Sequence, residues 1–361
     1  MSLLKDTTQT SFFVCCYRDD DVKPGDDFSE WLGCLHSRDI KVVQVENLSL
    51  EGVNMLVSES LKAFPRITLP LSVQLHAKTR GNPFFLRQFI DSLVSRGLIF
   101  LSLNPPRWAW NLDKISNVEM PVSVVALLVA EMRTLAPELK EGIRIVACLG
   151  SSVEKRTMQI ISGRLDIDLV AALDELITRG FLVKEDVSGV RFSHDKVQQS
   201  AYETMTFDEQ KSLHARLGLI LCDQTLLQDE YECLLFAAVT QVNLGGVDTS
   251  LDQSKRVHIG ALNLRAGKRS RELSAFDMAL GFLQSGIMWV SNCWSTDYDL
   301  TLALHTYATE TACLLNDLVK VIKFSSEVVS NARSYEEKLP CEFQKSSFRS
   351  CCRLSDVLLC S

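Results

Sequence analysis

The segment from Gly81 to Val94 constrains the fold of this chain more than any other stretch. Asn82 can cap a helix, Pro83 suits the first helical position, and Gly97 can end the helix. Between these ends, apolar side chains recur at the spacing of one helix face, at Phe85, Leu86, Phe89, Leu93 and Val94. The segment therefore predicts an amphipathic helix with a defined start and end.

Two apolar segments near the N-terminus predict β-strands. Residues 11–17 form an apolar run typical of a buried parallel strand, and residues 41–45 predict a second strand. Ser49 can cap the helix that follows, which runs to about Phe64. Because ligands bind at the carboxyl ends of strands in open α/β sheets, Arg18 is a candidate phosphate ligand. Its alternative role is an ion pair with the aspartates that follow it.

Residues 71–222 predict a mainly helical region that contains two short hairpins. Two helices occupy residues 71 to about 100, and residues 98–100 pair with residues 108–110 across an Asn-Pro-Pro turn. Further along, a series of helices is followed by a second hairpin, which is the layout of a winged helix. These later elements are expected near residues 123–135, 137–148, 154–162, 168–179, 181–183 and 190–192.

From residue 223 to about residue 340, the sequence predicts paired helices with a spacing like that of tetratricopeptide (TPR) repeats. Small and large residues alternate along residues 261–286, and residues 298–315 and 319–332 form the next expected pair. Helical hairpins of this kind bury their apolar faces by stacking on their neighbours. Residues 341–361 lose this pattern and are rich in Ser and Cys, so we expect an irregular tail there.

The charge of the chain argues against binding to nucleic acid. The net charge is −7 and the pI is about 5.5, so no basic field is available for phosphates. The helix expected at residues 168–179 would be the recognition helix, and it carries three acids before its first base. The apolar run at residues 122–130 is too short to cross a bilayer, and residues 1–6 lack signal-peptide features. We expect a cytoplasmic chain with no nucleic-acid or membrane partner.

The twelve cysteines predict neither a disulfide framework nor a metal site. No Cys-x-x-Cys pair and no Cys/His group has the spacing of zinc ligands. Most of the isolated cysteines lie on apolar helical stretches, where a thiol behaves as a small hydrophobe. We therefore expect these thiols to be reduced and buried, and we expect no bound metal.

Three segments of the chain resemble the STAND signalling ATPases, which belong to the AAA+ superfamily. Residues 14–22 resemble the sensor-1 strand with its arginine, and residues 81–86 resemble the Gly-x-Pro lid motif. Residues 192–202, together with 213–218, are similar to the end of the winged helix. That last pattern is typical of the origin-recognition-complex-like AAA ATPase modules fused to hybrid histidine kinases and serine/threonine kinases. The resemblance covers about residues 11–335.

The resemblance implies binding of ATP or ADP with Mg²⁺ in the parent family. It implies that Arg18 contacts the γ-phosphate and that Asn82 and Pro83 frame the adenine. It also implies that His194 contacts the diphosphate of bound ADP and holds the off state. Apart from the resemblance, Asn82 and Pro83 are helix-capping residues, and His194 is a surface residue next to the cap of the following helix. No cofactor is predicted for this chain by itself.

The sequence lacks the elements that ATP hydrolysis needs. Hydrolysis requires a Gly-x-x-x-x-Gly-Lys-Ser/Thr loop for the phosphates and an acid that holds Mg²⁺. The nearest match is Gly-Lys-Arg-Ser at residues 267–270, but Leu262 stands where the first glycine belongs, and the match falls within a helical stretch. No nucleophile, second histidine or paired carboxylate accompanies His194, so no catalytic residue is predicted.

We therefore expect a regulatory and protein-interaction segment of a STAND-type signalling ATPase that acts beside a kinase. Its partners would bind through the TPR-like region, and a kinase domain or a second copy of the chain are candidates. Two alternatives stay open: a free-standing helical-repeat adaptor without nucleotide dependence, and an ATPase whose P-loop is missing from this sequence. The expected fold is mainly α, with a remnant of an α/β nucleotide-binding core (1–70), a helical lid (71–119), a winged helix (120–222), a TPR-like α-superhelix (223–340) and a tail (341–361).

Overall fold

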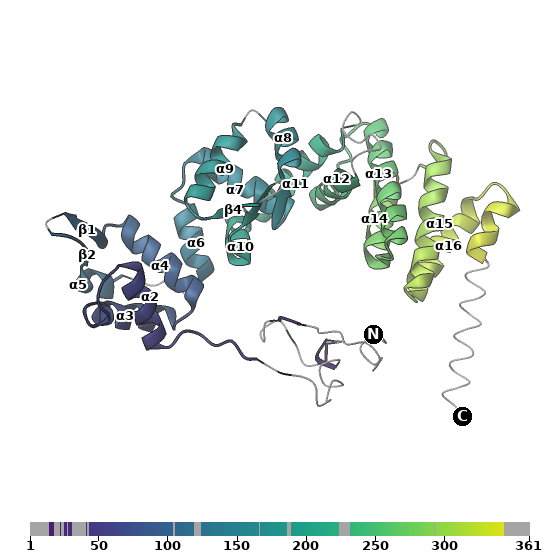
Figure 1. Ribbon diagram of the computed structural model, residues 1–361. Helices are drawn as coiled ribbons and strands as arrows, with labels where there is room; N and C mark the ends of the chain where they lie inside the picture. The colour runs from purple at the N-terminus through teal and green to yellow at the C-terminus, as the bar shows by residue number, and fades with distance from the viewer. Residues whose placement is uncertain are drawn as a thin grey trace, which may run out of the picture. The chain divides into compact units, whose positions relative to one another are not determined.

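The computed structural model is mainly helical (Figure 1). It divides into two compact units, residues 1–83 and 84–361. Within the described residues, the strands form one two-stranded and one three-stranded sheet. The prediction of a mainly α chain is thereby confirmed. The structure describes residues 14–17, 22, 25–26, 28–30, 41, 43–103, 105–118, 124–165, 167–185, 189–223, 232–291 and 293–342.

The start of the first unit differs from the prediction of two strands, of which the first was expected to be buried. Residues 14–17 and 43–45 have no regular secondary structure. Their apolar side chains are exposed, with Val14 at 73% and Val45 at 89% exposure. The prediction of a strand is therefore wrong in both of these segments, and so is the burial predicted for the first. An apolar run becomes a buried strand only beside partner strands, and the described part of this unit contains none.

Two helices, α2 (Leu50–Ser60) and α3 (Pro65–Thr79), pack against each other in the first unit. Ser49 caps α2 as predicted, because its hydroxyl oxygen accepts a hydrogen bond from a backbone N–H of the first turn. The side chain of Asn54 in α2 accepts a hydrogen bond from the hydroxyl of Thr68 in α3, at 2.8 Å. A polar link of this kind fixes how the two helices face each other.

The helix predicted after Gly81 is present as α4, and four of its five stripe residues are buried; Val94 is 39% exposed. Gly97 ends this helix with a φ of +65°, and its N–H donates to the carbonyl of Val94. The predicted hairpin follows, with Ile99 paired to Trp110 in antiparallel register. These elements are α4 (Pro83–Ser95), β1 (Ile99–Leu103), β2 (Pro106–Trp110) and α5 (Leu112–Ser116).

Residues 124–222 combine helices with a small sheet. The helices and the hairpin expected here are present, and a third strand, β3, pairs with β5 to give the sheet order β3-β5-β4. The name winged helix stays a prediction for this region, which we call the α/β body. Its elements are α6 (Val124–Met132), α7 (Pro137–Leu149), β3 (Ser152–Glu154), α8 (Lys155–Arg164), α9 (Leu169–Thr178), β4 (Leu182–Glu185), β5 (Gly189–Phe192), α10 (Asp195–Glu203) and α11 (Phe207–Leu221).

From α11 onward, each helix packs against the next one along the chain (Figure 1). Glycines allow two of these close approaches. A Cβ atom on Gly218 would lie 2.3 Å from the backbone N of Val242, and one on Gly267 would lie 2.7 Å from the side chain of Leu283. The repeat helices are α12 (Glu232–Gly245), α13 (Gln253–Glu272), α14 (Phe276–Trp289), α15 (Tyr298–Leu314) and α16 (Leu318–Asn331).

The hydrophobic core of the α/β body continues into the repeat helices. One cluster of buried side chains extends from Leu128 in α6 to Trp289 in α14. A second cluster, from Leu280 to Phe324, lies among α14, α15 and α16. Because each helix buries its apolar face against its neighbours, the repeat helices depend on stacking for their stability.

Candidate functional site

The start of α10 carries His194, the residue for which a nucleotide contact is predicted. His194 is the N-cap of α10 in extended backbone, and its Nδ1 atom accepts a hydrogen bond from the N–H of Lys196 at 3.1 Å. The Oδ1 atom of Asp195 accepts from the same N–H at 2.8 Å. The sequence placed His194 next to the cap of this helix, but His194 is itself the cap, with Asp195 beside it. Two side chains therefore satisfy one helix-start donor.

The imidazole of His194 is half-buried against an aromatic ring. It stacks on Phe84 with the ring centroids 4.1 Å apart and an angle of 16° between the planes. Its side chain is 33% exposed, so one part of the ring remains accessible. The Nδ1 atom also contacts Oδ1 of Asp195. Nδ1 accepts from Lys196 only when it carries no hydrogen and donates to Asp195 only when it carries one, so the two hydrogen bonds cannot form at the same time.

The glycine of the predicted lid motif has a clear structural role. Gly81 has a φ of +73°, and a Cβ atom there would lie 1.9 Å from the carbonyl oxygen of Leu48. The N–H of Leu48 donates to the carbonyl of Gly81 at 2.8 Å. The N–H of Asn82 donates to the carbonyl of Thr79, and Pro83 is the first residue of α4, as expected from its fixed φ.

The four predicted site residues fall in three places. Arg18 lies outside the described residues. Asn82 and Pro83 belong to the first unit and His194 to the second. A nucleotide site shared by these residues therefore stays a prediction. The nearest P-loop match, residues 267–270, lies inside α13, as the sequence analysis expects.

A polar chain of three buried residues and the half-buried Tyr202 links four helices, and no sequence motif pointed to it as a site. Tyr202 of α10 and His214 of α11 are joined through Oη and Nε2 at 2.8 Å, and Nδ1 of His214 lies 2.6 Å from Oε1 of Gln241 in α12. The Nε2 atom of Gln241 donates to the carbonyl of Cys148 in α7 at 2.7 Å. We call these four residues the buried relay. The sequence contains His214 within the family-like motif, but nothing in the sequence shows its burial.

The relay geometry constrains the hydrogen-bond roles of its histidine. Because the amide N–H of Gln241 is used by the carbonyl of Cys148, Oε1 of Gln241 faces His214 and requires a donor. Nδ1 of His214 therefore donates to Oε1 of Gln241, and Nε2 pairs with the hydroxyl of Tyr202. Burial raises the pKa of Tyr202, and it raises the pKa of the Cys148 thiol to about 12, so both stay protonated. The relay is a fully paired structural network.

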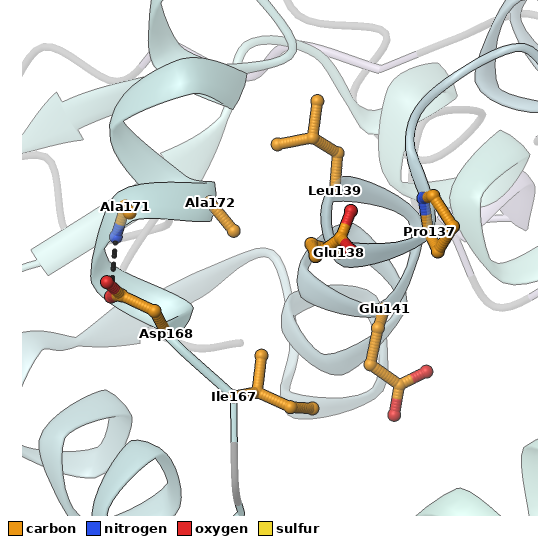
Figure 2. Close-up of a pocket in the computed structure, with 8 residues that line it drawn as sticks. All are labelled: Pro137, Glu138, Leu139, Glu141, Ile167, Asp168, Ala171 and Ala172. Atoms are coloured by element: carbon orange, nitrogen blue, oxygen red, sulfur yellow. Dashed lines mark hydrogen bonds between the residues drawn. The ribbon is translucent and has the colours of Figure 1, made fainter.

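A pocket of about 440 Å³ lies between the starts of α7 and α9 (Figure 2). Figure 2 shows the carboxylates of Glu138, Glu141 and Asp168 around it, and the Asp168 carboxylate accepts a hydrogen bond from the N–H of Ala171. Glu141 also forms an ion pair with Arg216. Phosphate groups would be repelled by this lining, which lies at the start of the helix considered as a DNA-recognition helix.

The described residues were predicted to hold neither a metal ion nor a membrane span, and their geometry bears on both of these and on the reactivity of the thiols. No group of three or more His, Cys, Asp or Glu side chains in the described ranges could hold a metal ion. No helix within those ranges is long and apolar enough to span a membrane. Cys148 and Cys222 are buried, with pKa values raised to about 12 by burial, so their thiols are not poised as nucleophiles.

The structure defines a helical-repeat protein whose repeats continue from a small α/β body. No family model matches the sequence. The chain is similar to Hybrid signal transduction histidine kinase G of Dictyostelium discoideum, with 24% identity over 296 residues. That alignment covers 68% of this chain and 9% of the relative, so the chain spans less than a tenth of that protein's length.

One solved structure shows a limited likeness to this chain. It is the crystal structure of a STAND protein with a tetratricopeptide repeat sensor from Pyrococcus horikoshii. The likeness covers 85% of this chain and 45% of that chain, with 14% sequence identity and a TM-score of 0.40. A likeness at this level carries no role from that protein to this chain.

Proposed function

We propose that this chain is a regulatory, protein-interaction segment of a STAND-type signalling ATPase linked to a kinase, and that it does not hydrolyse ATP by itself. The observation that carries the proposal is the run of stacked helices from α11 to α16, because stacked helices of this kind form extended surfaces that bind partners. The sequence similarity to a hybrid histidine kinase supports the signalling context. The α/β body would be the winged helix of such a module.

The lack of hydrolysis follows from the missing phosphate loop. Backbone N–H donors and the lysine of a P-loop supply most of the affinity for the phosphates, and the nearest match here is helical. A dissociation constant of 1 μM corresponds to about −8 kcal/mol, which an adenine pocket and one arginine are not expected to reach. Isothermal titration of this chain with ATP and Mg²⁺ should show no micromolar binding. Micromolar binding or turnover would instead favour a true ATPase.

The partner-binding role is tested by locating the contacts on the intact chain. Chemical cross-linking in the chain's own cells, followed by mass spectrometry of the cross-linked peptides, identifies which residues contact other proteins. We expect the cross-links to concentrate in residues 232–342. Cross-links confined to residues 43–222 would contradict the proposal. If the chain binds its partner proteins equally well with and without nucleotide, the alternative of a helical-repeat adaptor without nucleotide dependence is favoured.

We further propose that His194 senses ADP in a longer parent protein that contains a P-loop. In that protein His194 would contact the diphosphate, Asn82 and Pro83 would frame the adenine, and Arg18 would contact the γ-phosphate. A ligand shifts a two-state switch only through contacts that differ between the states. His194→Ala should therefore speed ADP release, by about tenfold or more if one charge-assisted hydrogen bond is lost. Equal ADP off-rates for the two proteins would remove this role.

A further inference from the structure

Positive charge in the repeat helices is concentrated on α13. Its twenty residues, Gln253–Glu272, include six Lys or Arg residues and one acid. Neighbouring helices α12, α14 and α15 contain no Lys or Arg, and the whole chain has a net charge of −7. A local positive surface on an acidic protein selects for a partner of the opposite sign.

Three of these six cations border a pocket of about 380 Å³ on one face of α13, which we call the α13 pocket. Its apolar side is formed by Leu235 from α12 together with two residues of α13. Its polar side carries three cations and one carboxylate. Recognition sites combine apolar surface with a few placed polar groups in this way. The lining residues are Leu235, Ala261, Leu264, Arg265, Lys268, Arg269 and Glu272.

An aromatic residue from α15 orients the central cation. The Nζ atom of Lys268 lies 4.6 Å from the ring centroid of Tyr307, and the guanidinium of Arg271 lies 5.0 Å from the same centroid. Arg271 also forms an ion pair with Glu310 at 2.8 Å, which ties α13 to α15. The Tyr307 ring holds the ammonium group of Lys268 in place. Because Lys268 is exposed, this group also reaches solvent.

The one carboxylate of the pocket can be replaced at small cost. Glu272 pairs with Arg269 at 2.7 Å, and the side chains are 62% and 37% exposed, respectively. An exposed ion pair of this kind contributes about 0–1 kcal/mol to stability. An incoming carboxylate can therefore take the place of Glu272 beside Arg269.

We propose that the α13 pocket is the docking site for an acidic segment of a partner protein, in which carboxylates alternate with apolar side chains. The carboxylates would pair with Arg265, Lys268 and Arg269, and the apolar side chains would lie on Leu235 and its apolar neighbours. This inference rests on the proposed function and names the chemistry of the partner. Nucleic acid fits less well, because the pocket offers an apolar side and only three cations, on a chain of net negative charge.

Fluorescence anisotropy on the full chain tests the proposal with a short labelled peptide of alternating Glu and Leu. We expect saturable binding that weakens with added salt, and Lys268→Glu should raise the dissociation constant by about tenfold or more. The matched control is Lys255→Glu, the same charge change on the same helix at an exposed residue that does not line the pocket, and it should leave binding unchanged. Lys268→Arg should retain binding, and Lys268→Gln should weaken it without adding repulsion.

Several outcomes would overturn the proposal. These are no binding at about 1 mM peptide, equal losses in Lys268→Glu and Lys255→Glu, or tighter binding of an oligonucleotide than of the peptide. Circular dichroism of each variant confirms that the helices are intact. If peptide binding fails while cross-links still map to residues 232–342, only the acidic-segment inference is lost. Cross-links confined to residues 43–222 would remove the proposed function as well.

Discussion

Two histidines, twenty residues apart in the sequence, lie in opposite environments in the second unit. His194 is at the half-buried start of α10, where it and Asp195 accept from one N–H. His214 is 3% exposed within the buried relay, where each ring nitrogen has a single partner. At the start of α10 two side chains accept from the same N–H, so the loss of one should cost little stability. In the buried relay each ring nitrogen has one partner, so the loss of any residue should leave another without its hydrogen bond. A substitution of His194 should therefore affect stability less than a substitution of His214, which holds the relay together.

We expect the largest loss of stability at Gly218, the glycine that lets α11 and α12 approach each other around the relay. A Cβ atom on Gly218 would meet backbone atoms of Val242 at 2.3 and 2.4 Å, so Gly218→Ala should force these helices apart and cost about 3 kcal/mol of unfolding free energy. Urea unfolding measures this cost. The matched control is Gly281→Ala in α14, where nothing lies within 4 Å, and it should stabilise by about 0.4–1 kcal/mol. Equal effects of the two changes would contradict the close approach.

A smaller loss is expected when the histidine of the relay is replaced by an aromatic ring that cannot form hydrogen bonds. His214→Phe leaves the hydroxyl of Tyr202 and Oε1 of Gln241 without partners inside the protein. Unpaired buried polar groups cost about 1–3 kcal/mol each, so we expect a loss of about 2 kcal/mol in unfolding free energy. The same change at the half-buried site, His194→Phe, should cost much less. Similar losses at the two positions would remove the distinction between them.

A third histidine, His305 in α15, extends the comparison to pH. Burial lowers its pKa, against a hydrogen bond to the carbonyl of Thr301, which raises it. The folded pKa then lies below the unfolded value of about 6.5, so the folded state resists protonation. Stability is present above about pH 6.5 and is lost as the pH falls from there through the folded pKa, by at most about 1.4 kcal/mol per pH unit.

Urea midpoints at pH 7.5 and 5.5 test this expectation by comparing the wild-type chain with His305→Phe. The substitution removes the titrating group, so the loss of stability at the lower pH should be smaller in the variant. Comparing the two proteins cancels the contribution of all other titrating groups. A loss of the same size in both would show that His305 does not contribute.

The smallest effect is expected at the start of α10. Removing an N-cap side chain costs about 0.5–2 kcal/mol, and Asp195 still accepts from the N–H of Lys196 in His194→Ala. We therefore expect a loss near the lower limit, about 0.5 kcal/mol, in urea unfolding. The double variant His194→Ala/Asp195→Ala should cost more than the sum of the single changes, because it removes both acceptors. Additive losses would mean that only one of the two side chains caps the helix.

The starts and ends of helices could be predicted wherever a capping residue or a glycine lies within a few residues of the helix end. Ser49 caps α2, Asp168 caps α9 through the N–H of Ala171, and Gly97 and Gly180 end their helices with positive φ values. Capping side chains and left-handed glycines act on the backbone next to them, so their effect does not depend on distant parts of the chain. The hairpin after α4 was predictable for the same reason, because turn residues separate two short apolar runs.

Other features depend on partners far away in the sequence. β3 has only three residues, and its pairing with β5, more than thirty residues further on, makes it a strand. The apolar runs at residues 14–17 and 43–45 have the composition of strands but lack a neighbouring strand among the described residues, so they stay exposed. The sequence shows His194 and His214 alike as polar residues near helices. Only tertiary packing places His214 between α10 and α12 and leaves His194 half-exposed, because burial depends on which surfaces meet.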